Sequence, residues 1–260
     1  MLKFSEANAK TKKLYKVEAL AEWLTDNRQV YSLDLLSGWS CPFAKECLSK
    51  ATPTGEISAA GNPRLKIVDG KDTEFRCFSA SQEVKNPSLY KLRKHNFDLL
   101  RQSKNMDLLL MDSMPKDAGI IRLSVGGDIF NSDYMWALWL TASENPNTLF
   151  YGYTKSLRYW IDVVEQMPIL DNLVLTASYG GRDDWLIEHC DLRSAKVVFS
   201  EAEADMLGLE IDHDDSHAAI PALRDQDFAL LIHGVQPAGS EAAKALSALK
   251  GKGSYSRTNA

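Results

Sequence analysis

Short apolar, β-branched runs alternate with helical patterns along this 260-residue chain, and that alternation limits the folds open to it. The runs that begin at Gly119, Thr148, Asn172 and Ala195 follow one another at intervals of about 25 residues, the length of a strand–loop–helix–loop unit. Continuous apolar runs such as 197–199 suit strands buried on both faces of a parallel sheet. The pattern predicts an α/β fold. The predicted strands are residues 31–36, 119–125, 148–153, 172–178, 195–200 and 228–233.

The segments between these runs carry helix signals. Ser132 and Ser156 each precede a helical pattern and are predicted N-caps. The acidic residues 201–203 suit the positive N-terminus of a short helix that begins after Ser200. Pro87 is expected to break a helix over 81–104. Further helices are predicted over 133–142, 157–167 and 240–249, and residues 52–62, rich in Pro, Gly and small side chains, are predicted to form a loop.

Regular crossovers between six strands predict a complete or partial (β/α) TIM-like barrel with predominantly parallel strands. A doubly wound open sheet is the alternative. We expect one domain over residues 1–250 and a flexible tail over 251–260, which is rich in Gly, Ser and Lys.

Composition restricts the partners. The net charge of −5 argues against a general nucleic-acid binder. No apolar stretch has the length of a membrane span, and residues 1–6 have no apolar segment typical of a signal peptide. We therefore expect a cytoplasmic protein that does not bind membranes.

Three cysteines are the main candidates for chemistry. Cys41 and Cys47 lie in the loop after the run 31–36, and Cys77 follows in an aromatic segment. A chain of this length does not need disulfides for stability, so such cysteines in a reducing compartment favour metal binding. Thiolates select zinc or iron–sulfur clusters over hard cations. The alternative is that they are small core residues; we interpret Cys190 as incidental.

Polar residues follow the ends of several predicted strands, and in parallel α/β folds these ends share one edge. Gly126, Gly127 and Asp128 follow one strand, while Lys155 and Arg182 follow two others. We expect them to line a pocket for a cofactor or small-molecule substrate. Arg76 is a further candidate for charge pairing there. The alternative is that the glycines form only a turn and Lys155 is a solvated charge.

A second cluster, residues 212–217, carries His213 and His217 with three carboxylates. It resembles a hard-metal or zinc site. Two histidines four residues apart share a face only on a helix, and this segment is predicted to be a loop. A solvated acidic loop is therefore the preferred interpretation, with His217 also considered as a cluster or phosphate ligand.

Long strings of the sequence resemble the phage "gene product 88" domain family over most of the chain. This resemblance implies a phage-encoded protein in the host cytoplasm and carries little knowledge of function. The strings are residues 40–47, 72–83, 125–128, 150–156, 198–204 and 213–218.

The cysteines also bear a distant likeness to the radical S-adenosylmethionine barrels. That likeness implies a 4Fe–4S cluster on three cysteines after the first strand, and a glycine-rich turn, here 126–128, that holds the methionyl group of S-adenosylmethionine. The usual cysteines lie in one short C-x3-C-x2-C loop. Here five residues separate Cys41 from Cys47, and 29 more precede Cys77. The spacing favours a cluster on three thiolates over binding of adenosylmethionine.

Three hypotheses follow. The first is a cubane iron–sulfur cluster, 4Fe–4S or 3Fe–4S, on Cys41, Cys47 and Cys77, with redox or radical-type activity on an unknown substrate. The second is a zinc site of three cysteines with His217 or His95. The third is a phage protein without enzymatic activity that binds a host or virion protein. The tryptophans available for such an interface are Trp39, Trp136, Trp139, Trp160 and Trp185. Tryptophans are more often core residues.

Overall fold

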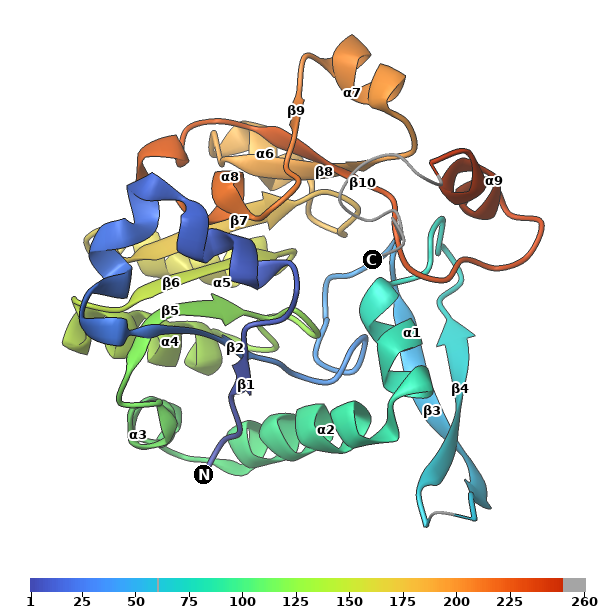
Figure 1. Cartoon of the computed structure of the whole chain (residues 1–260), viewed down its shortest axis with the longest axis horizontal. Helices are drawn as coiled ribbons and strands as arrows, with labels where there is room; N and C mark the ends of the chain where they lie inside the picture. The colour runs from blue at the N-terminus through green and yellow to red at the C-terminus, as the bar shows by residue number, and fades with distance from the viewer. Residues whose placement is uncertain (60, 250–260) are drawn as a thin grey trace.

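A mostly parallel sheet runs through the centre of the molecule (Figure 1). The computed structural model describes residues 1–59 and 61–249. In the order of the sheet, its eight strands are β1 (Ser5–Glu6), β2 (Gln29–Leu33), β5 (Ala118–Leu123), β6 (Leu149–Thr154), β7 (Leu173–Ser178), β8 (Ser194–Val198), β10 (Phe228–Leu231) and β9 (Glu210–Ile211).

The strand order confirms the predicted α/β class and parallel sheet. Every pair from β2 to β9 is parallel, and only the short β1 lies antiparallel, at the edge beside β2. From β2 to β10 the strands follow the chain without the reversal that defines a doubly wound sheet. Within the described residues the pairs end at β1 on one side and β9 on the other, so they form no closed TIM-like barrel.

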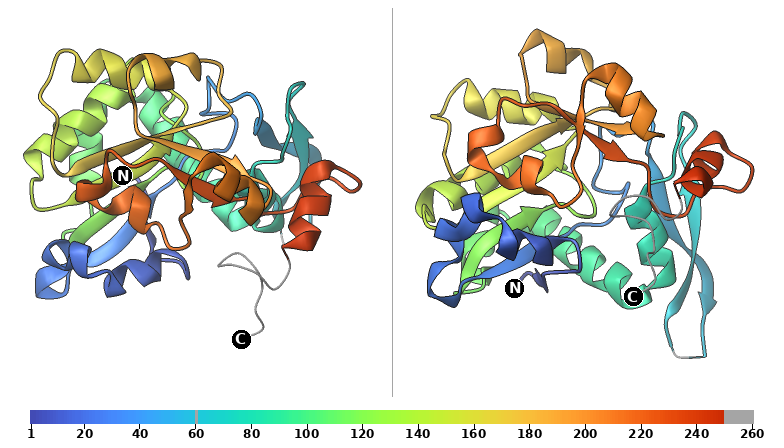
Figure 2. Two further views of the ribbon diagram at one scale, coloured as in Figure 1. Left: turned by 90° about the horizontal axis from the view of Figure 1, so that it is seen from above. Right: turned by 45° about the horizontal axis from the view of Figure 1, so that its top comes forward.

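Different elements cover the two faces of the sheet because successive strand residues point to opposite sides. Ile121 and Phe150 face a core made with α2 (Pro87–Gln102), α3 (Met106–Ser113), α4 (Ser132–Glu144) and α5 (Leu157–Val164). Ile120 and Tyr151 face the opposite core. That core contains Leu14 of η1 (Thr11–Lys16), Leu20 of η2 (Glu18–Asn27), and α8 (Ser216–Ala219). Figure 2 shows these elements on either side of the strands.

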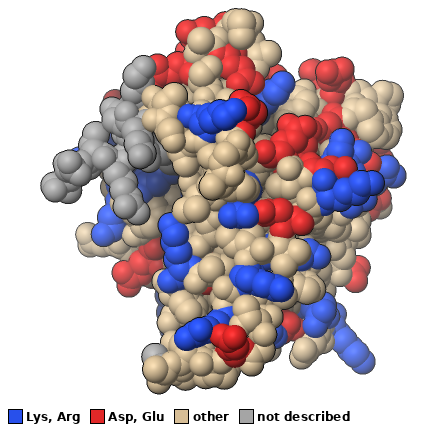
Figure 3. Space-filling model, turned by 90° about the vertical axis from the view of Figure 1, so that its right-hand side faces the viewer, with Lys and Arg blue, Asp and Glu red and all other residues tan. Residues whose placement is uncertain are grey.

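A hairpin of β3 (Ser49–Ile57) and β4 (Pro63–Asp69) projects from the edge of the molecule (Figure 1). The predicted loop over 52–62 is therefore wrong for its first half, which forms part of β3. Side chains along β4 alternate between exposed and half-buried, and those at the end of β3 are all exposed. Neither strand therefore has a continuous run of buried apolar residues. Lys and Arg side chains alternate with Asp and Glu on this face (Figure 3), as in the Arg64–Glu56 pair at 3.1 Å.

Helix boundaries follow the predicted signals with two exceptions. Pro87 separates α1 (Phe78–Lys85) from α2, as expected. Ser200 caps α7 (Glu201–Leu207) by accepting a hydrogen bond from the Glu203 amide at 3.1 Å. Asn131 rather than Ser132 caps α4, and the Ser156 hydroxyl donates to the Ile129 carbonyl instead of capping α5. The remaining helices are α6 (Trp185–His189), η3 (Pro221–Leu223) and α9 (Glu241–Ala248).

The tail predicted over 251–260 lies outside the described residues. In the part of the chain that the structure describes, no helix is long and apolar enough to cross a membrane.

Asn172 joins one helix to two strands. Its buried Nδ2 donates to the carbonyls of Ala142, Asn145 and Thr148 at 2.9, 3.0 and 3.0 Å. The backbone carbonyl of Asn172 accepts a hydrogen bond from the Phe150 amide at 2.7 Å. The end of α4 and the starts of β6 and β7 therefore depend on one side-chain amide.

We predict that Asn172→Ala lowers the free energy of unfolding by about 2 kcal/mol, because two buried carbonyls and one partly buried carbonyl lose a donor. Urea unfolding followed by circular dichroism measures the change. Asn147→Ala, at an exposed position two residues before β6, is the control and should change stability by less than about 0.5 kcal/mol. Equal stability of the two variants would contradict the assigned role.

Candidate functional site

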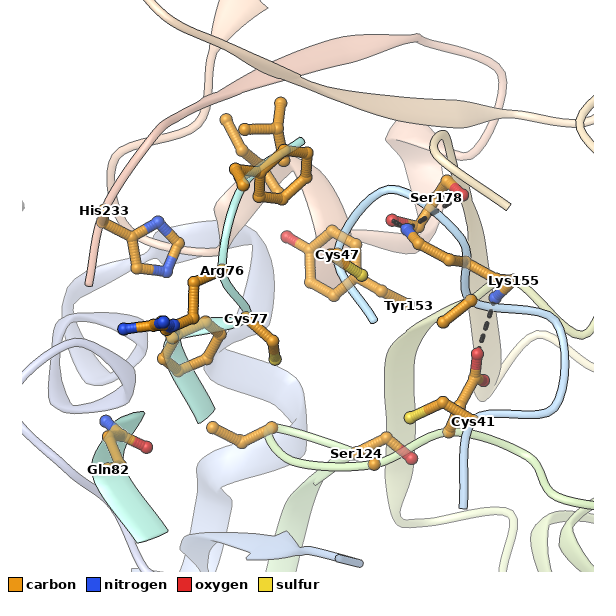
Figure 4. A pocket seen from close by; sticks show the side chains of 18 of the residues that line it. Cys41, Cys47, Arg76, Cys77, Gln82, Ser124, Tyr153, Lys155, Ser178 and His233 are labelled. Atoms are coloured by element: carbon orange, nitrogen blue, oxygen red, sulfur yellow. Dashed lines mark hydrogen bonds between the residues drawn. The ribbon is translucent and has the colours of Figure 1, made fainter. Parts of the chain in front are cut away.

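A cavity of about 430 Å³ lies at the carboxyl edge of the parallel strands (Figure 4). Residues just after β5, β6 and β7 line it, together with the loop 37–47, which we call the cysteine loop, and the start of α1. The segment 8–10 and β10 complete the wall. The edge at which sequence predicted a site is therefore the edge that carries a cavity.

Cys41, Cys47 and Cys77 all line this cavity, and Figure 4 shows their sulfur atoms around one central space. Each side chain is half-buried, and all are free thiols. Cys41 and Cys47 come from the cysteine loop after β2, whereas Cys77 lies at the N-terminal boundary of α1. The fold thus brings together thiols that 29 intervening residues separate in sequence.

Close backbone packing fixes the cysteine loop. Gly38 has φ of +69°, and a Cβ atom there would lie 2.4 Å from the Ser49 carbonyl oxygen, so only glycine fits. The Gly38 amide donates to the Cys41 Sγ at 3.3 Å. At the far end of the loop, the amides of Lys45 and Glu46 donate to the Gly180 carbonyl at 3.1 and 3.0 Å.

Burial raises the pKa of all three thiols because it disfavours the thiolate. The pKa of Cys41 rises well above its usual value, with further increases from Asp128 and the other two cysteines. Burial raises the pKa of Cys77 to about 12, although the backbone N–H groups of Ala80 and Ser79 lower it. Burial also raises the pKa of Cys47, and Lys155 opposes that increase. Cys47 also raises the pKa of both Cys41 and Cys77, because a second thiolate nearby would repel the first.

The thiols do not form a site for a single ion. Within the described residues, no group of three or more His, Cys, Asp or Glu side chains is placed to hold one metal ion. His95 bonds to the Met1 carbonyl at 3.0 Å, and His217 pairs with Glu210 at 3.0 Å. Neither histidine lines the cavity, so the Cys3His set considered from sequence is not assembled.

Asp128 and Lys155 line the cavity as predicted, but most of their polar atoms form hydrogen bonds to neighbouring loop residues. The Asp128 carboxylate accepts from the Thr154 hydroxyl at 2.6 Å and from the Ile129 and Lys155 amides at 2.7 and 2.9 Å. Burial nevertheless raises its pKa. The Lys155 ammonium donates to the Ser178 hydroxyl at 2.6 Å and the Tyr179 carbonyl at 2.6 Å. The Lys155 ammonium is therefore hydrogen-bonded to neutral oxygen atoms and has no carboxylate among these acceptors.

Some of the other predicted site residues line the cavity, and some do not. Gly127 lines the cavity, and Arg76 lines it while pairing with Asp69 at 2.5 Å. Gly126 is absent from the lining; a Cβ there would lie 2.5 Å from the Arg93 Cζ, so this glycine allows close packing. The Arg182 side chain is exposed, and its amide donates to the Phe43 carbonyl at 2.9 Å. The backbone of Arg182 therefore holds the cysteine loop in place, and its side chain does not line the cavity.

A buried guanidinium connects the loops beneath the cavity. Arg93 of α2 lies 3.1 Å from Glu83 of α1 and 3.6 Å from Asp34, just after β2. Glu83 in turn accepts from the Ser37 amide and hydroxyl at 3.0 and 2.7 Å. Asp34 accepts from the Val125 amide at 3.0 Å. One cation therefore ties together the start of the cysteine loop, the helix after Cys77 and the glycine turn.

Sequence reasoning missed several polar residues of the cavity, among them Lys10, Arg122, Tyr153 and His233. One signal was available, because Arg122 is a charged residue inside an otherwise apolar predicted strand. The 212–217 segment was misinterpreted as solvated. Asp212 and Asp215 are fully buried, and Asp215 pairs with Lys10 at 2.5 Å and with Arg122 at 2.8 Å.

A family model described as Gene product 88 matches residues 1–250. The chain belongs to this family. The match confirms the resemblance to the phage gene product 88 proteins. No curated protein and no solved structure gives a significant match, so the likeness to radical S-adenosylmethionine barrels has no support from these comparisons.

We predict that His233 makes stability depend on pH. Burial lowers its pKa from 6.5 to about 4. The unfolded chain therefore binds more protons between these values, and stability present above pH 6.5 is lost as pH falls toward about 4. With a discount for partial exposure, the loss is on the order of 2 kcal/mol. Urea unfolding of His233→Gln should show a smaller fall than wild type over this range.

The control for this pH effect is His95→Gln, which removes a half-buried histidine outside the cavity. It should retain the fall seen in wild type. An identical pH dependence in wild type and His233→Gln would contradict the prediction.

We predict that Lys155→Met slows alkylation of Cys47 in metal-free protein. Lys155 lowers the pKa of Cys47, so its removal reduces the thiolate fraction at a fixed pH, and the rate should fall roughly threefold. Iodoacetamide labelling with mass spectrometry measures each cysteine separately. Cys41 is the internal control because Lys155 is not among the groups that shift its pKa. Equal slowing of both cysteines would indicate a general change of the loop.

Proposed function

We propose that this chain binds a cubane iron–sulfur cluster, 4Fe–4S or 3Fe–4S, on Cys41, Cys47 and Cys77. The observation that carries the proposal is the convergence of three thiols, from two segments, on one cavity (Figure 4). Thiolates are the ligands that hold such clusters in proteins. In a 4Fe–4S cluster on three thiolates, the fourth iron can bind a small molecule or a ligand other than cysteine.

The lack of a single-ion site among the described residues favours a cluster over one zinc ion. One zinc ion requires its ligands around a single point, at about 2.3 Å for each sulfur. The described residues offer no such group. A cubane is wider than one ion, so its ligands stand farther apart around a shared space. Thiols that line one cavity without meeting at a point fit this requirement.

The charges around the thiols also support the proposal. Four cationic side chains line the cavity, namely Lys10, Arg76, Arg122 and Lys155, and the first three of them already pair with carboxylates outside the lining. Three thiolates carry three negative charges, more than the two positive charges of an oxidised 4Fe–4S core. Nearby cations reduce the cost of burying that excess negative charge. Lys155, beside Cys47, is placed to contribute most directly.

The activity we propose is redox or radical-type chemistry on a small molecule held in the same cavity. The strands from β2 to β10 form a parallel sheet in chain order, and the functional residues of parallel α/β folds lie at this edge. Binding of adenosylmethionine is not part of the proposal: Asp128 is committed to loop contacts, and Gly126 packs against Arg93. We place the protein in the host cytoplasm, where thiols stay reduced.

Binding of a host or virion protein is a second candidate, and two tryptophans favour it. Trp39 and Trp185 are 47% and 57% exposed, whereas Trp139 is buried, and Trp136 and Trp160 pack against the core. This candidate does not require the thiols. It predicts that serine at all three cysteines leaves phage yield unchanged in a folded variant.

We predict that protein purified without oxygen contains iron and sulfide and absorbs visible light. Cys41→Ser, Cys47→Ser and Cys77→Ser should each lower the iron content at least about fivefold, because a cubane held by two thiolates is labile. Cys190→Ser is the matched control, since this fourth cysteine does not line the cavity. Iron-free, colourless wild type would overturn the proposal, and zinc in its place would favour the zinc alternative.

A further inference from the structure

Apolar side chains from β8 and β10 line part of the cavity. Val197 of β8 and Leu230 of β10 are register partners on neighbouring parallel strands, and both belong to the lining. Ile232 lines the cavity two residues beyond Leu230, and its amide continues the pairing by donating to the Val198 carbonyl at 2.9 Å. Val197, Leu230 and Ile232, which we call the apolar wall, therefore lie at neighbouring positions along two paired segments.

Two ring contacts join these strands to the segment that carries Cys77. The Phe75 ring, which lines the cavity, packs edge-to-face on Phe199, directly after β8, with ring centroids 6.3 Å apart. The Phe78 ring, also in the lining, lies 4.6 Å from the His233 imidazole, which follows β10. Phe75 and Phe78 flank Cys77 in sequence. The Cys77 segment is thus packed against the ends of the strands that carry the apolar wall.

Two cations of the lining are already held by other groups of the protein. Arg76 donates to both carboxylate oxygens of Asp69, at distances from 2.5 to 3.2 Å. A lysine ammonium has three donor hydrogens. Lys155 has three acceptors for them, the Ser178 carbonyl and hydroxyl and the Tyr179 carbonyl, at 3.2, 2.6 and 2.6 Å. Binding a charged ligand at either cation would therefore disrupt contacts that the fold already makes.

The other charged side chains of the lining are engaged in the same way. Lys10 and Arg122 contact the buried carboxylate of Asp215 at 2.5 and 2.8 Å. Burial raises the pKa of Asp212, and Lys10 opposes that rise, so Lys10 also acts on a second buried carboxyl group. Asp128 accepts three hydrogen bonds from neighbouring loop residues. Each charged side chain of the lining is thus paired or hydrogen-bonded within the described part of the protein.

A neutral molecule fits this lining better than an ion does. An ion that makes no bond to the thiols would lose its hydration in the cavity and would have to compete with existing partners for a counter-charge. His233 adds no charge near neutral pH, because burial lowers its pKa to about 4. An apolar skeleton, by contrast, gains free energy when it leaves water for the apolar wall. The volume of about 430 Å³ is within the range of small-molecule sites, roughly 300 to 1,000 Å³.

We propose that the cavity binds a neutral, largely apolar small molecule, with its carbon skeleton along Val197, Leu230 and Ile232. This inference deepens the proposed function by naming the substrate class, and it rests on that function only for the chemistry that follows binding. Because the Cys77 segment packs against the same strands, the skeleton lies near this thiol. Binding of the molecule needs no cluster, so the two proposals can fail separately.

The experiment is fluorescence titration of metal-free protein with N-phenyl-1-naphthylamine, a neutral dye that brightens in apolar surroundings. Octanol, octanoate and octylammonium then compete with the bound dye; they share one carbon chain and differ in charge. We expect octanol to displace the dye at concentrations at least about tenfold lower than either ion, and salt should not weaken its binding. No dye binding, or an ion that competes as well as octanol, would overturn the inference.

Two variants locate the site. Leu230→Asn keeps the size of a half-buried side chain but replaces apolar surface with an amide, and it should weaken octanol binding about tenfold. Val197→Thr is a milder change of the same kind and should weaken binding about threefold, which covers the case in which Leu230→Asn does not fold. Leu209→Asn is the matched control, since Leu209 is also half-buried but does not line the cavity. Unchanged affinity in the folded cavity variants would overturn the inference.

Cysteine labelling tests the position of the molecule. Saturating octanol should slow the reaction of Cys77 with iodoacetamide at least about threefold, because access to this thiol is reduced. Cys190, which does not line the cavity, should react at an unchanged rate. Equal rates for Cys77 with and without octanol would contradict the assigned position.

Iron analysis of protein purified without oxygen separates the two proposals. Wild type that binds octanol but contains no iron would leave the apolar site intact and remove the cluster. Wild type that contains iron, and whose metal-free form does not bind octanol, would do the reverse.

Discussion

The contacts of the buried Arg93 guanidinium hold the candidate site together. The thiols belong to two loops that the strand pairing alone does not bring together. Arg93 connects Asp34, at the end of β2, to Glu83, in the helix that follows Cys77. It also packs so closely against the glycine turn that position 126 has no room for a Cβ atom. The cavity walls are thus positioned by a cation that does not line the cavity.

Burying the Arg93 network costs free energy, so its role must justify that cost. Two carboxylates share one guanidinium, and all three side chains are at most 5% exposed. Burial raises the pKa of Glu83, and Arg93 and Ser37 only partly oppose that rise. Replacing such a network by apolar residues often leaves a protein equally stable or more so, so stability alone does not explain it. Its contacts are directional, however, and they fix the cysteine loop and α1 in one relative position. Preorganisation of the thiols accounts for the cost better than stability does.

The sequence predicted those parts of the fold that depend on local patterns. Largely apolar runs located every strand from β5 to β8 to within two residues at each end, because strands buried on both faces carry few polar residues. The β3–β4 hairpin lacks that signal: its tip is exposed, and its Pro53 and Gly55 indicate a loop. Whether such a sheet closes into a barrel depends on what packs against its faces. Here η1, η2 and α8 pack on one face, and no local pattern shows that these segments pack there.

The site was predictable to the extent that it lies at strand ends. That rule located Cys41, Asp128 and Lys155, and it missed Lys10, whose partner Asp215 lies 205 positions away in sequence. Side-chain roles were harder to predict than positions. Gly126 and Arg182 have the right residue types at the right edge, but one packs on a guanidinium and the other acts through its backbone. Only the three-dimensional contacts separate a residue that faces the cavity from one that supports its wall.

The raised pKa values of the thiols bear on how the proposed cluster would bind. At neutral pH all three cysteines are protonated, so a metal cluster must displace three protons when it binds. The thiolates gained in that exchange make the cavity more negative. Lys155 lowers the pKa of Cys47 and therefore favours the exchange at that thiol, while Asp128 raises the pKa of Cys41 and opposes it there. The cavity thus holds one cation that helps a cluster to bind and one carboxylate that resists it, and the balance between them sets how strongly binding depends on pH.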